Sequence, residues 1–197
     1  QLQKYLKNAI DASLNMVSLD TDTSTNDMVL IFSTGDKKFA VTNKEESAAF
    51  QALMDDACID LAKQMARDGE GAETLIEVQV AGASSVKDAR IISKNVVSSP
   101  LVKSAVTGAS ANWGRLVMAI GKDPSVKVNE FKLDIWVGDI QLVSVGEPVD
   151  YDVKAAESYM KGDTVVFKID LNLGKHTATA WGCDLTNEFV RINTEYN

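Results

Sequence analysis

A single carboxylate between two glycines is the residue of this chain best placed to do chemistry. Glu70 lies in the run DGEG, residues 68–71, directly after a long predicted helix that Gly69 ends. The C-terminal end of a helix carries partial negative charge, so a carboxylate there is disfavoured by a few tenths of a kcal/mol, roughly, unless it meets a cation. The flanking glycines let other groups approach closely. Glu70 is therefore either a ligand-binding carboxylate, for example for an amine, or a solvated residue in a loop that stops a helix.

The second candidate, Asn193, belongs to the polar closing segment CDLTNEFVRINTEY, residues 183–196. Its amide both donates and accepts hydrogen bonds, which suits recognition of a zwitterion. Apolar residues alternate with polar ones along this segment, at Phe189, Val190, Ile192 and Tyr196. The alternation predicts that the last residues pack against the protein.

Two further polar runs have structural interpretations. TDTSTND, residues 21–27, is predicted to be a turn held by its own side-chain oxygens. In NWGR, residues 112–115, Asn112 is expected to cap a helix, Trp113 to fill the core and Arg115 to pair with a carboxylate. Neither run contains a histidine or a paired acid that would indicate acid–base or metal chemistry.

Familiar catalytic motifs are not found in the sequence. It contains no glycine-rich phosphate loop, no GxSxG and no HExxH. The single histidine, His176, and Cys183 are an odd number of residues apart on one predicted strand, so they point to opposite faces and cannot form a nucleophilic pair. The residues themselves therefore lead to a small-ligand site around Glu70, without a metal, and not to a reaction.

Composition excludes several classes of function. The chain has 197 residues, of which 45% are hydrophobic and 24% charged, with a formal net charge of −8. An acidic protein without a basic cluster repels phosphate backbones, so we expect no nucleic-acid partner. No stretch is long and apolar enough to span a membrane, and residues 1–14 are amphipathic rather than a signal peptide, so we expect a soluble cytoplasmic protein with reduced cysteines.

Apolar periodicity predicts the elements that must position these residues. Helices are expected over 3–14, from a cap at Ser47 to Arg67, over 86–97, 112–120 and 151–160. The long helix should bury one stripe, formed by Phe50, Leu53, Met54, Ala57, Leu61 and Met65. Strands are expected over 16–19, 28–32, 38–42, 73–80, 131–137, 140–145, 164–173 and 175–183. Residues 101–108 are less regular.

The order of these elements predicts the fold class. Gly138-Asp139 and Gly174 each join two strands, which predicts two hairpins. A regular βαβ series is not present, so we expect an α+β fold with a mostly antiparallel or mixed sheet rather than a doubly wound one. No linker or repeat divides residues 1–197, which are expected to form one domain.

The polar runs, taken together, resemble the β chain of glutamate N-acetyltransferase, also called ornithine acetyltransferase, of arginine biosynthesis. The resemblance rests on TDTSTND, DGEGAETLIEV (68–78), SPLVKSAV (99–106) with NWGR, TATAWGCDLT (177–186) and VRINTEY (190–196), in the family's order. Two departures are small. Residues 108–111 read GASA where the family usually has an acidic residue and a proline, and Gly182 precedes Cys183 where threonine is common.

The resemblance implies a layered α/β sandwich and an acyltransferase of amino-acid biosynthesis. Family members cleave themselves before a threonine, which becomes the N-terminal nucleophile of the β chain and is its own base through the α-amine. That threonine takes acetyl from N-acetylornithine and passes it to glutamate by a ping-pong route. The segment carrying it would precede Gln1, so no catalytic residue is expected within this chain.

The resemblance also assigns the substrate contacts and the partner. Glu70 and Asn193 match the family's substrate-binding residues, for the end that donor and acceptor share. A separate α chain from the same precursor would complete the domain, in an α2β2 heterotetramer. No cofactor is implied, although acetyl-CoA is allowed as a second donor. Two alternatives remain at this point: a related aminopeptidase or amidohydrolase with an N-terminal nucleophile, and a non-catalytic interaction subunit.

Overall fold

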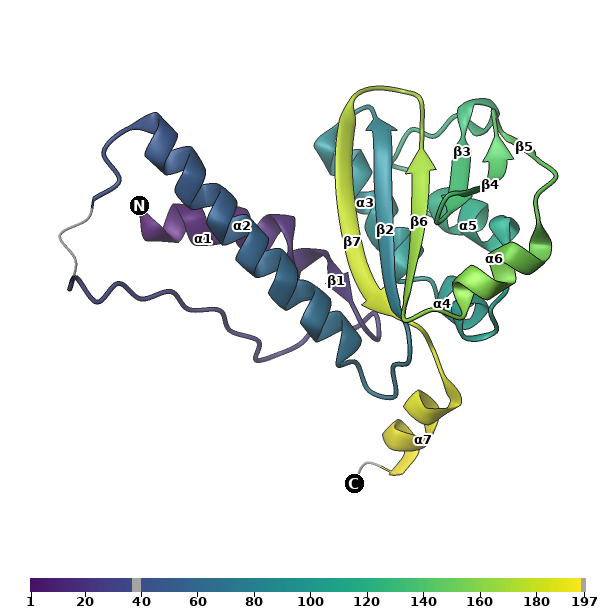
Figure 1. The fold of residues 1–197 in the computed structure, drawn as a ribbon, viewed down its shortest axis with the longest axis horizontal. Coiled ribbons are helices and arrows are strands. Elements are labelled where there is room, and N and C mark those ends of the chain that lie inside the picture. Colours follow the sequence, from purple (N-terminus) through teal and green to yellow (C-terminus); the bar gives the residue numbers. More distant parts are fainter. Residues whose placement is uncertain (37–39, 196–197) are drawn as a thin grey trace.

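The computed structural model describes residues 1–36 and 40–195, and within them a mixed sheet with helices on both faces (Figure 1). The strands of this sheet lie in the order β1-β7-β2-β6-β3-β4-β5. The β1–β7 and β2–β6 pairs are parallel and the other pairs antiparallel. The strands are β1 (Val17–Ser18), β2 (Leu75–Ala83), β3 (Asp134–Val137), β4 (Ile140–Ser144), β5 (Glu147–Pro148), β6 (Thr164–Asp170) and β7 (His176–Cys183). The predicted α+β class is confirmed.

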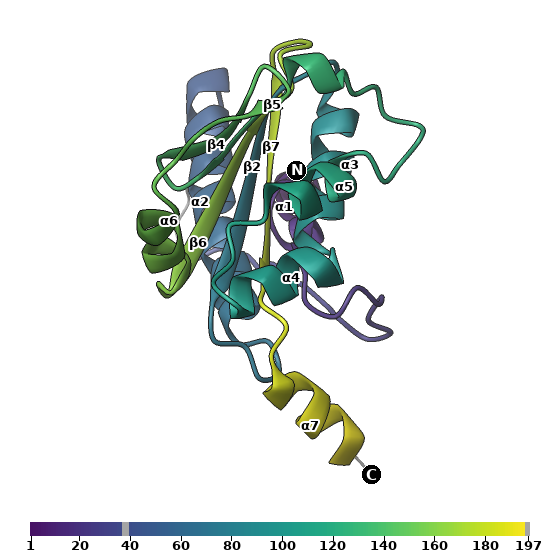
Figure 2. The same ribbon diagram turned by 90° about the vertical axis from the view of Figure 1, so that its right-hand side faces the viewer.

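The helices form a layer on each face of the sheet. They are α1 (Leu2–Ala12), α2 (Lys44–Arg67), α3 (Val86–Val97), α4 (Pro100–Thr107), α5 (Trp113–Ile120), α6 (Val153–Met160) and α7 (Asn187–Glu195), with 3₁₀ turns at Leu14–Met16 and Glu130–Lys132. Figure 2 shows α3, α4 and α5 on one face and α2 and α6 on the other. Within the described residues, no helix has the length and apolar character needed to cross a membrane.

The main core lies between the sheet and the layer of α3 and α5. Strand β2 supplies Ile76, Val78 and Val80 to it, and these alternate residues share one face of the strand. Helix α3 contributes Ile92 and Val96, which are four residues apart and fully buried. Burying this apolar area holds the end of β2 and the start of β7, and with them the loops that leave those strands.

Three predicted features of the sheet differ from the structure. Strands β6 and β7 do not form a hairpin, because β2 lies between them. Their connection instead crosses the end of β2, where Leu173 N and Gly174 N both donate to Gly82 O. Local turn signals cannot reveal a strand from elsewhere in the chain that inserts between two neighbours. The hairpin of β3 and β4 is confirmed, and the short strand β5 after it was not predicted.

The predicted strand 28–32 is wrong, since these residues lie in neither a helix nor a strand. Met28, Leu30 and Phe32 have 74%, 63% and 82% of their surface exposed. Only residues 40–42 of the predicted strand 38–42 are described, and they are not in a strand; Lys38 and Phe39 lie outside the described residues. A β-forming pattern therefore exists here without a partner strand among the described residues.

Helix α2 also differs in its start and in its buried face. Asn43, not Ser47, caps it: Asn43 Oδ1 accepts a 2.9 Å hydrogen bond from Glu46 N. Ser47 lies one turn further on, where its hydroxyl bonds the Tyr5 hydroxyl. The buried residues are the small ones, Cys58, Ala62 and Ala66, whereas Leu53 and Leu61 of the predicted stripe are 68% and 51% exposed. Small residues let α2 lie close to the sheet, and the larger apolar side chains face outward.

Two differences concern α4 and α7. Residues 100–107, expected to be less regular, form α4, with Pro100 in its first turn and the Ser99 hydroxyl accepting from Val102 N. The closing segment forms a helix, α7, which has no buried residue and projects from the body of the protein (Figure 1). The expectation of a packed end is thus wrong for the described residues 187–195; Tyr196 lies outside them.

Candidate functional site

The structure brings Glu70 and Asn193 together, although 123 residues separate them in the sequence. Asn193 Nδ2 donates a 2.7 Å hydrogen bond to Glu70 Oε2 and a second one, of 2.9 Å, to Phe189 O. Both side chains are exposed to solvent. Because an amide nitrogen has two hydrogens, both are used here, and Asn193 can offer a ligand only its oxygen. Their role as substrate contacts remains a prediction.

The glycines beside Glu70 are required by close packing on both sides. A Cβ on Gly69 would lie 2.8 Å from Cys183 Sγ, and a Cβ on Gly71 would lie 2.5 Å from Phe189 N. Gly71 also has a φ of +67°, which disfavours any other residue. The end of β7 and the start of α7 therefore hold the Glu70 loop between them, which confirms the close approach predicted from the two glycines.

The segment between β7 and α7 fixes this loop through two buried polar side chains. Asp184 Oδ1 accepts hydrogen bonds from Glu73 N and Thr74 N, at 2.9 and 3.1 Å. The Thr186 hydroxyl donates a 2.6 Å hydrogen bond to Gly71 O and accepts one from Phe189 N at the start of α7. Asp184 and Thr186 are each only 5% exposed, so their bonds are shielded from water.

A buried lysine lies beneath the same segment. Lys103 of α4 is 2% exposed, and its ammonium donates to Cys183 O at 2.6 Å and to Ser18 O at 3.2 Å. Burial lowers the pKa of Lys103, while Cys183, Asp184 and Asp20 nearby favour its charged form. Burial also raises the pKa of the Cys183 thiol, which is not an activated nucleophile.

A second buried charge lies on the other face of the sheet. Glu77 of β2 is 8% exposed and accepts hydrogen bonds from Trp181 Nε1 at 2.9 Å and Gln79 Nε2 at 2.6 Å, with Lys63 Nζ of α2 at 2.9 Å. Burial raises the pKa of Glu77, but the hydrogen bonds from Gln79, Lys63 and Trp181 outweigh it, and the pKa is below its usual value. This group fastens α2 to the sheet and is remote in sequence from the Glu70 loop.

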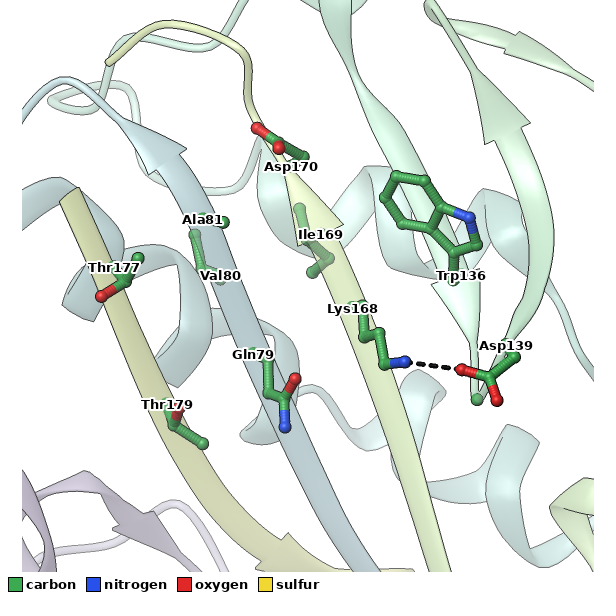
Figure 3. Close-up of a pocket in the computed structure, with 11 residues that line it drawn as sticks. Gln79, Val80, Ala81, Trp136, Asp139, Lys168, Ile169, Asp170, Thr177 and Thr179 are labelled. Atoms are coloured by element: carbon green, nitrogen blue, oxygen red, sulfur yellow. Dashed lines mark hydrogen bonds and ion pairs between the residues drawn. The ribbon is translucent and has the colours of Figure 1, made fainter. Parts of the chain in front are cut away.

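A cavity of about 510 Å³ lies on the part of the sheet that α2 leaves open, and it does not include Glu70 or Asn193. Figure 3 shows Trp136 beside the Lys168–Asp139 ion pair, whose atoms are 2.8 Å apart, with Gln79 and Thr179 on the neighbouring strands. Polar side chains make up most of this face, so it can remain solvated. Its ion pair has ordinary surface chemistry, and we do not assign it a ligand.

The remaining polar runs are largely explained by local structure. TDTSTND lines a cavity of about 680 Å³ and bonds to itself, with Asn26 N donating to Ser24 Oγ, as predicted for a turn. Asn112 caps α5, also as predicted, by accepting from Arg115 N at 3.2 Å. Arg115 bonds the carbonyl of Leu101 rather than a carboxylate, and Trp113 is 36% exposed rather than in the core.

Sequence reasoning missed Lys103, Asp184, Thr186 and Glu77 as residues that build or support the site. A signal was present for two of them. Lys103 interrupts the apolar run Leu101–Val106, and Glu77 interrupts the apolar run of β2, and a charge at a buried position usually has a specific partner. Asp184 and Thr186 look like ordinary loop residues, and only the fold reveals their partners. Within residues 1–36 and 40–195, His, Cys, Asp and Glu side chains form no group of three or more that could hold a metal ion.

The fold and the site define a mixed α/β protein with a binding site rather than a reactive centre. A carboxylate and an amide oxygen, held on a clamped loop and the adjacent helix, can bind and orient a cationic group, but neither is the nucleophile of an acyl transfer. A family model described as the ArgJ family matches residues 1–197. The chain therefore belongs to the ArgJ family.

Individual relatives agree with this assignment. The chain is 47% identical to the arginine biosynthesis bifunctional protein ArgJ of Oceanobacillus iheyensis and 44% identical to that of Symbiobacterium thermophilum, in both cases over 99% of this chain. It covers 48% and 49% of those proteins, so the chain spans about half the length of the curated relatives it matches. The crystal structure of the ArgJ protein from Bacillus halodurans superposes with a TM-score of 0.94 at 42% identity, covering 99% of this chain and 92% of that one.

Proposed function

We propose that this chain is the β chain of an acetyltransferase that moves an acetyl group from N-acetylornithine to glutamate, releasing ornithine and N-acetylglutamate. The observation that carries the proposal is the 2.7 Å hydrogen bond between Glu70 and Asn193. These are the two positions that the family resemblance assigns to substrate, and they come from opposite parts of the chain. Family membership over the whole chain supports the reaction class.

The chemistry of the pair favours an ammonium ligand. Asn193 spends both amide hydrogens on Glu70 and Phe189, so a ligand meets the amide oxygen and the Glu70 carboxylate, which are both acceptors. N-acetylornithine carries a side-chain ammonium and glutamate an α-ammonium, so each substrate offers the pair one cation. A hydrogen bond to a charged group contributes about 1.5–3 kcal/mol, which is enough to orient a small substrate.

The reaction itself is assigned to a threonine ahead of Gln1, as the first residue of the mature β chain. Its hydroxyl oxygen attacks the acetyl carbonyl of N-acetylornithine, and its own α-amine takes the proton. The bond from the acetyl carbon to nitrogen breaks, ornithine leaves with a proton, and an acetyl ester remains on the threonine. Attack by the glutamate amine then breaks that ester and regenerates the hydroxyl. Acetyl-CoA as a donor to glutamate is a further, optional part of the proposal.

An α chain from the same precursor is the proposed partner, in an α2β2 cytoplasmic assembly. Two observations support it. The chain spans about half the length of its curated relatives, so a comparable length of polypeptide is left to supply a second chain. It also exposes large apolar side chains, notably Phe32 at 82% and Leu53 at 68%, which a stable monomer would bury. We propose that the α chain covers these residues.

Mass spectrometry of the complete two-chain protein tests the function. With N-acetylornithine alone, the β chain should gain one acetyl group, and glutamate should remove it with formation of N-acetylglutamate. Two-substrate kinetics should give parallel lines. Intersecting lines without an adduct would refute the acyl-enzyme route, and loss of the adduct to water without transfer to glutamate would assign the protein to the amidohydrolases instead.

A further inference from the structure

The ammonium group of Lys103 is an unusual feature of the interior that the proposed reaction does not use. Lys103 is 2% exposed and belongs to α4, an otherwise apolar helix whose buried residues include Val102, Ala105 and Val106. Removing an ammonium group from water is costly unless other polar groups replace the water. A lysine at such a position therefore needs specific partners, and a methionine of similar length would fill the same space without that cost.

Its partners are the ends of two strands. The ammonium donates to Ser18 O at the end of β1 and to Cys183 O at the end of β7, and it lies 4.0 Å from Cys183 Sγ. Strands β1 and β7 run parallel, with Ser18 paired with Gly182, so the lysine closes the pair just where the ladder ends. The nearby carboxyl groups of Asp20 and Asp184 add favourable charge.

The segment that Lys103 holds is the one against which the Glu70 loop packs. Cys183 Sγ occupies the space beside Gly69, and Asp184, the next residue, holds the backbone of Glu73 and Thr74. The same helix supplies a second contact one turn later, since the Thr107 hydroxyl donates to Leu185 O at 2.8 Å. Contacts thus run without a gap from α4 through Cys183 and Asp184 to the loop that carries Glu70.

We propose that Lys103 is a positioning residue of the Glu70–Asn193 site, which acts by holding the carbonyl of Cys183 and so fixing the place of the Glu70 loop. The structural part of this proposal stands on the contacts alone. The kinetic part rests on the proposed acetyl transfer, and the two parts are tested separately.

Hydrogen exchange of the complete two-chain protein tests the structural part, with Lys103→Met as the variant. Lys94→Met is the matched control, because the Lys94 ammonium also donates to carbonyls beside β1, those of Asn15 and Val17, but contacts neither Cys183 nor the loop. The amides of Glu73 and Thr74 should exchange at least about tenfold faster in Lys103→Met and within about threefold of the parent in Lys94→Met. Lys103→Arg, which keeps the cation, should restore slow exchange.

Kinetics test whether the effect reaches the substrate site. Lys103→Met should raise KM for N-acetylornithine by about tenfold while leaving kcat within about threefold, since the nucleophile is elsewhere. Combining it with Glu70→Gln should cost no more than the more damaging single change, because both act through one carboxylate. A structural role unrelated to the site would give additive losses and unchanged KM.

Parental exchange rates at Glu73 and Thr74 in Lys103→Met, or equal acceleration in Lys94→Met, would overturn the proposal. If Lys103→Met does not fold, Lys103→Gln takes its place under the same criteria. A parent protein that transfers no acetyl group would refute the proposed function, while the exchange result would still decide the positioning role.

Discussion

Replacing Gly71 with alanine should damage both the stability of the protein and its proposed site. The residue has a φ of +67°, and a left-handed conformation costs an ordinary residue about 1–2 kcal/mol. The new Cβ would in addition lie 2.5 Å from Phe189 N and 2.8 Å from Glu188 C, which are backbone atoms and cannot rotate away. Crowding of this kind typically costs about 1–3 kcal/mol. Together they predict a loss of about 2–5 kcal/mol in unfolding free energy.

Relief of the clash must come from moving α7, since the loop is held on its other side by Cys183 and Asp184. Because α7 carries Asn193, its movement should break the bond to Glu70, and kcat/KM should fall by at least about tenfold. The measurements are denaturant unfolding and steady-state acetyl transfer on the complete protein.

Gly35→Ala is the control for Gly71→Ala. Gly35 has a φ of +73°, but a Cβ there would meet nothing within 4 Å, so it carries the conformational cost without the clash. Gly35→Ala should therefore lose only about 1–2 kcal/mol and keep its kcat/KM. Equal stability losses for the two variants, with unchanged activity in Gly71→Ala, would refute the argument that Gly71 clamps the site.

Further predictions concern the pair, the buried charge and the partner. Glu70→Gln should leave self-cleavage intact and lower kcat/KM by about 10- to 150-fold; a value within twofold of the parent would indicate a merely solvated loop residue. Asn193→Ala should lower kcat/KM for both substrates by about tenfold or more, and a loss confined to one substrate would contradict a shared pocket. The lowered pKa of Glu77 stabilises the fold above its usual value of 4.5 and should cease to do so as the pH falls through the lower folded value, so Glu77→Gln should flatten the acid limb of a stability–pH curve, and an unchanged curve would exclude this role. Residues 1–197 expressed alone should aggregate or be inactive, whereas a monodisperse monomer with a cooperative melt would argue against the α chain as an obligate partner.

The sequence predicted those parts of the fold that local patterns determine. Helix α3, helix α5 with its Asn112 cap and the hairpin at Gly138 follow from periodicity and turn chemistry, which act within a few residues. The position of β2 between β6 and β7 depends on contacts across about ninety residues, and no local signal encodes it. The outward stripe of α2 failed for a related reason: its apolar side chains have the correct period, but the surface they would pack against is not in the described chain.

The candidate site was predicted in its chemistry and not in its construction. Two glycines beside Glu70 correctly indicated a close approach, because only glycine leaves room for neighbouring backbone. The groups that approach could not be read from the sequence, since Cys183 and Phe189 reach the loop only after β7 has paired with β2. The family resemblance supplied Asn193, whose position on an exposed helix gives no physical reason to single it out.

The two halves of the pair are held very differently, which has a consequence for how the site works. Glu70 lies on a loop fixed by Asp184, Thr186 and the close contact at Gly69, all shielded from water. Asn193 lies near the far end of α7, a helix with no buried residue among those described, which is tied to the body at its first turn and through the bond to Glu70. A helix fixed at one end can swing, so the carboxylate is the rigid half of the pair and the amide the adjustable one. Substrates that present an ammonium group from different positions can then meet a constant carboxylate, while α7 adjusts the amide oxygen to each of them.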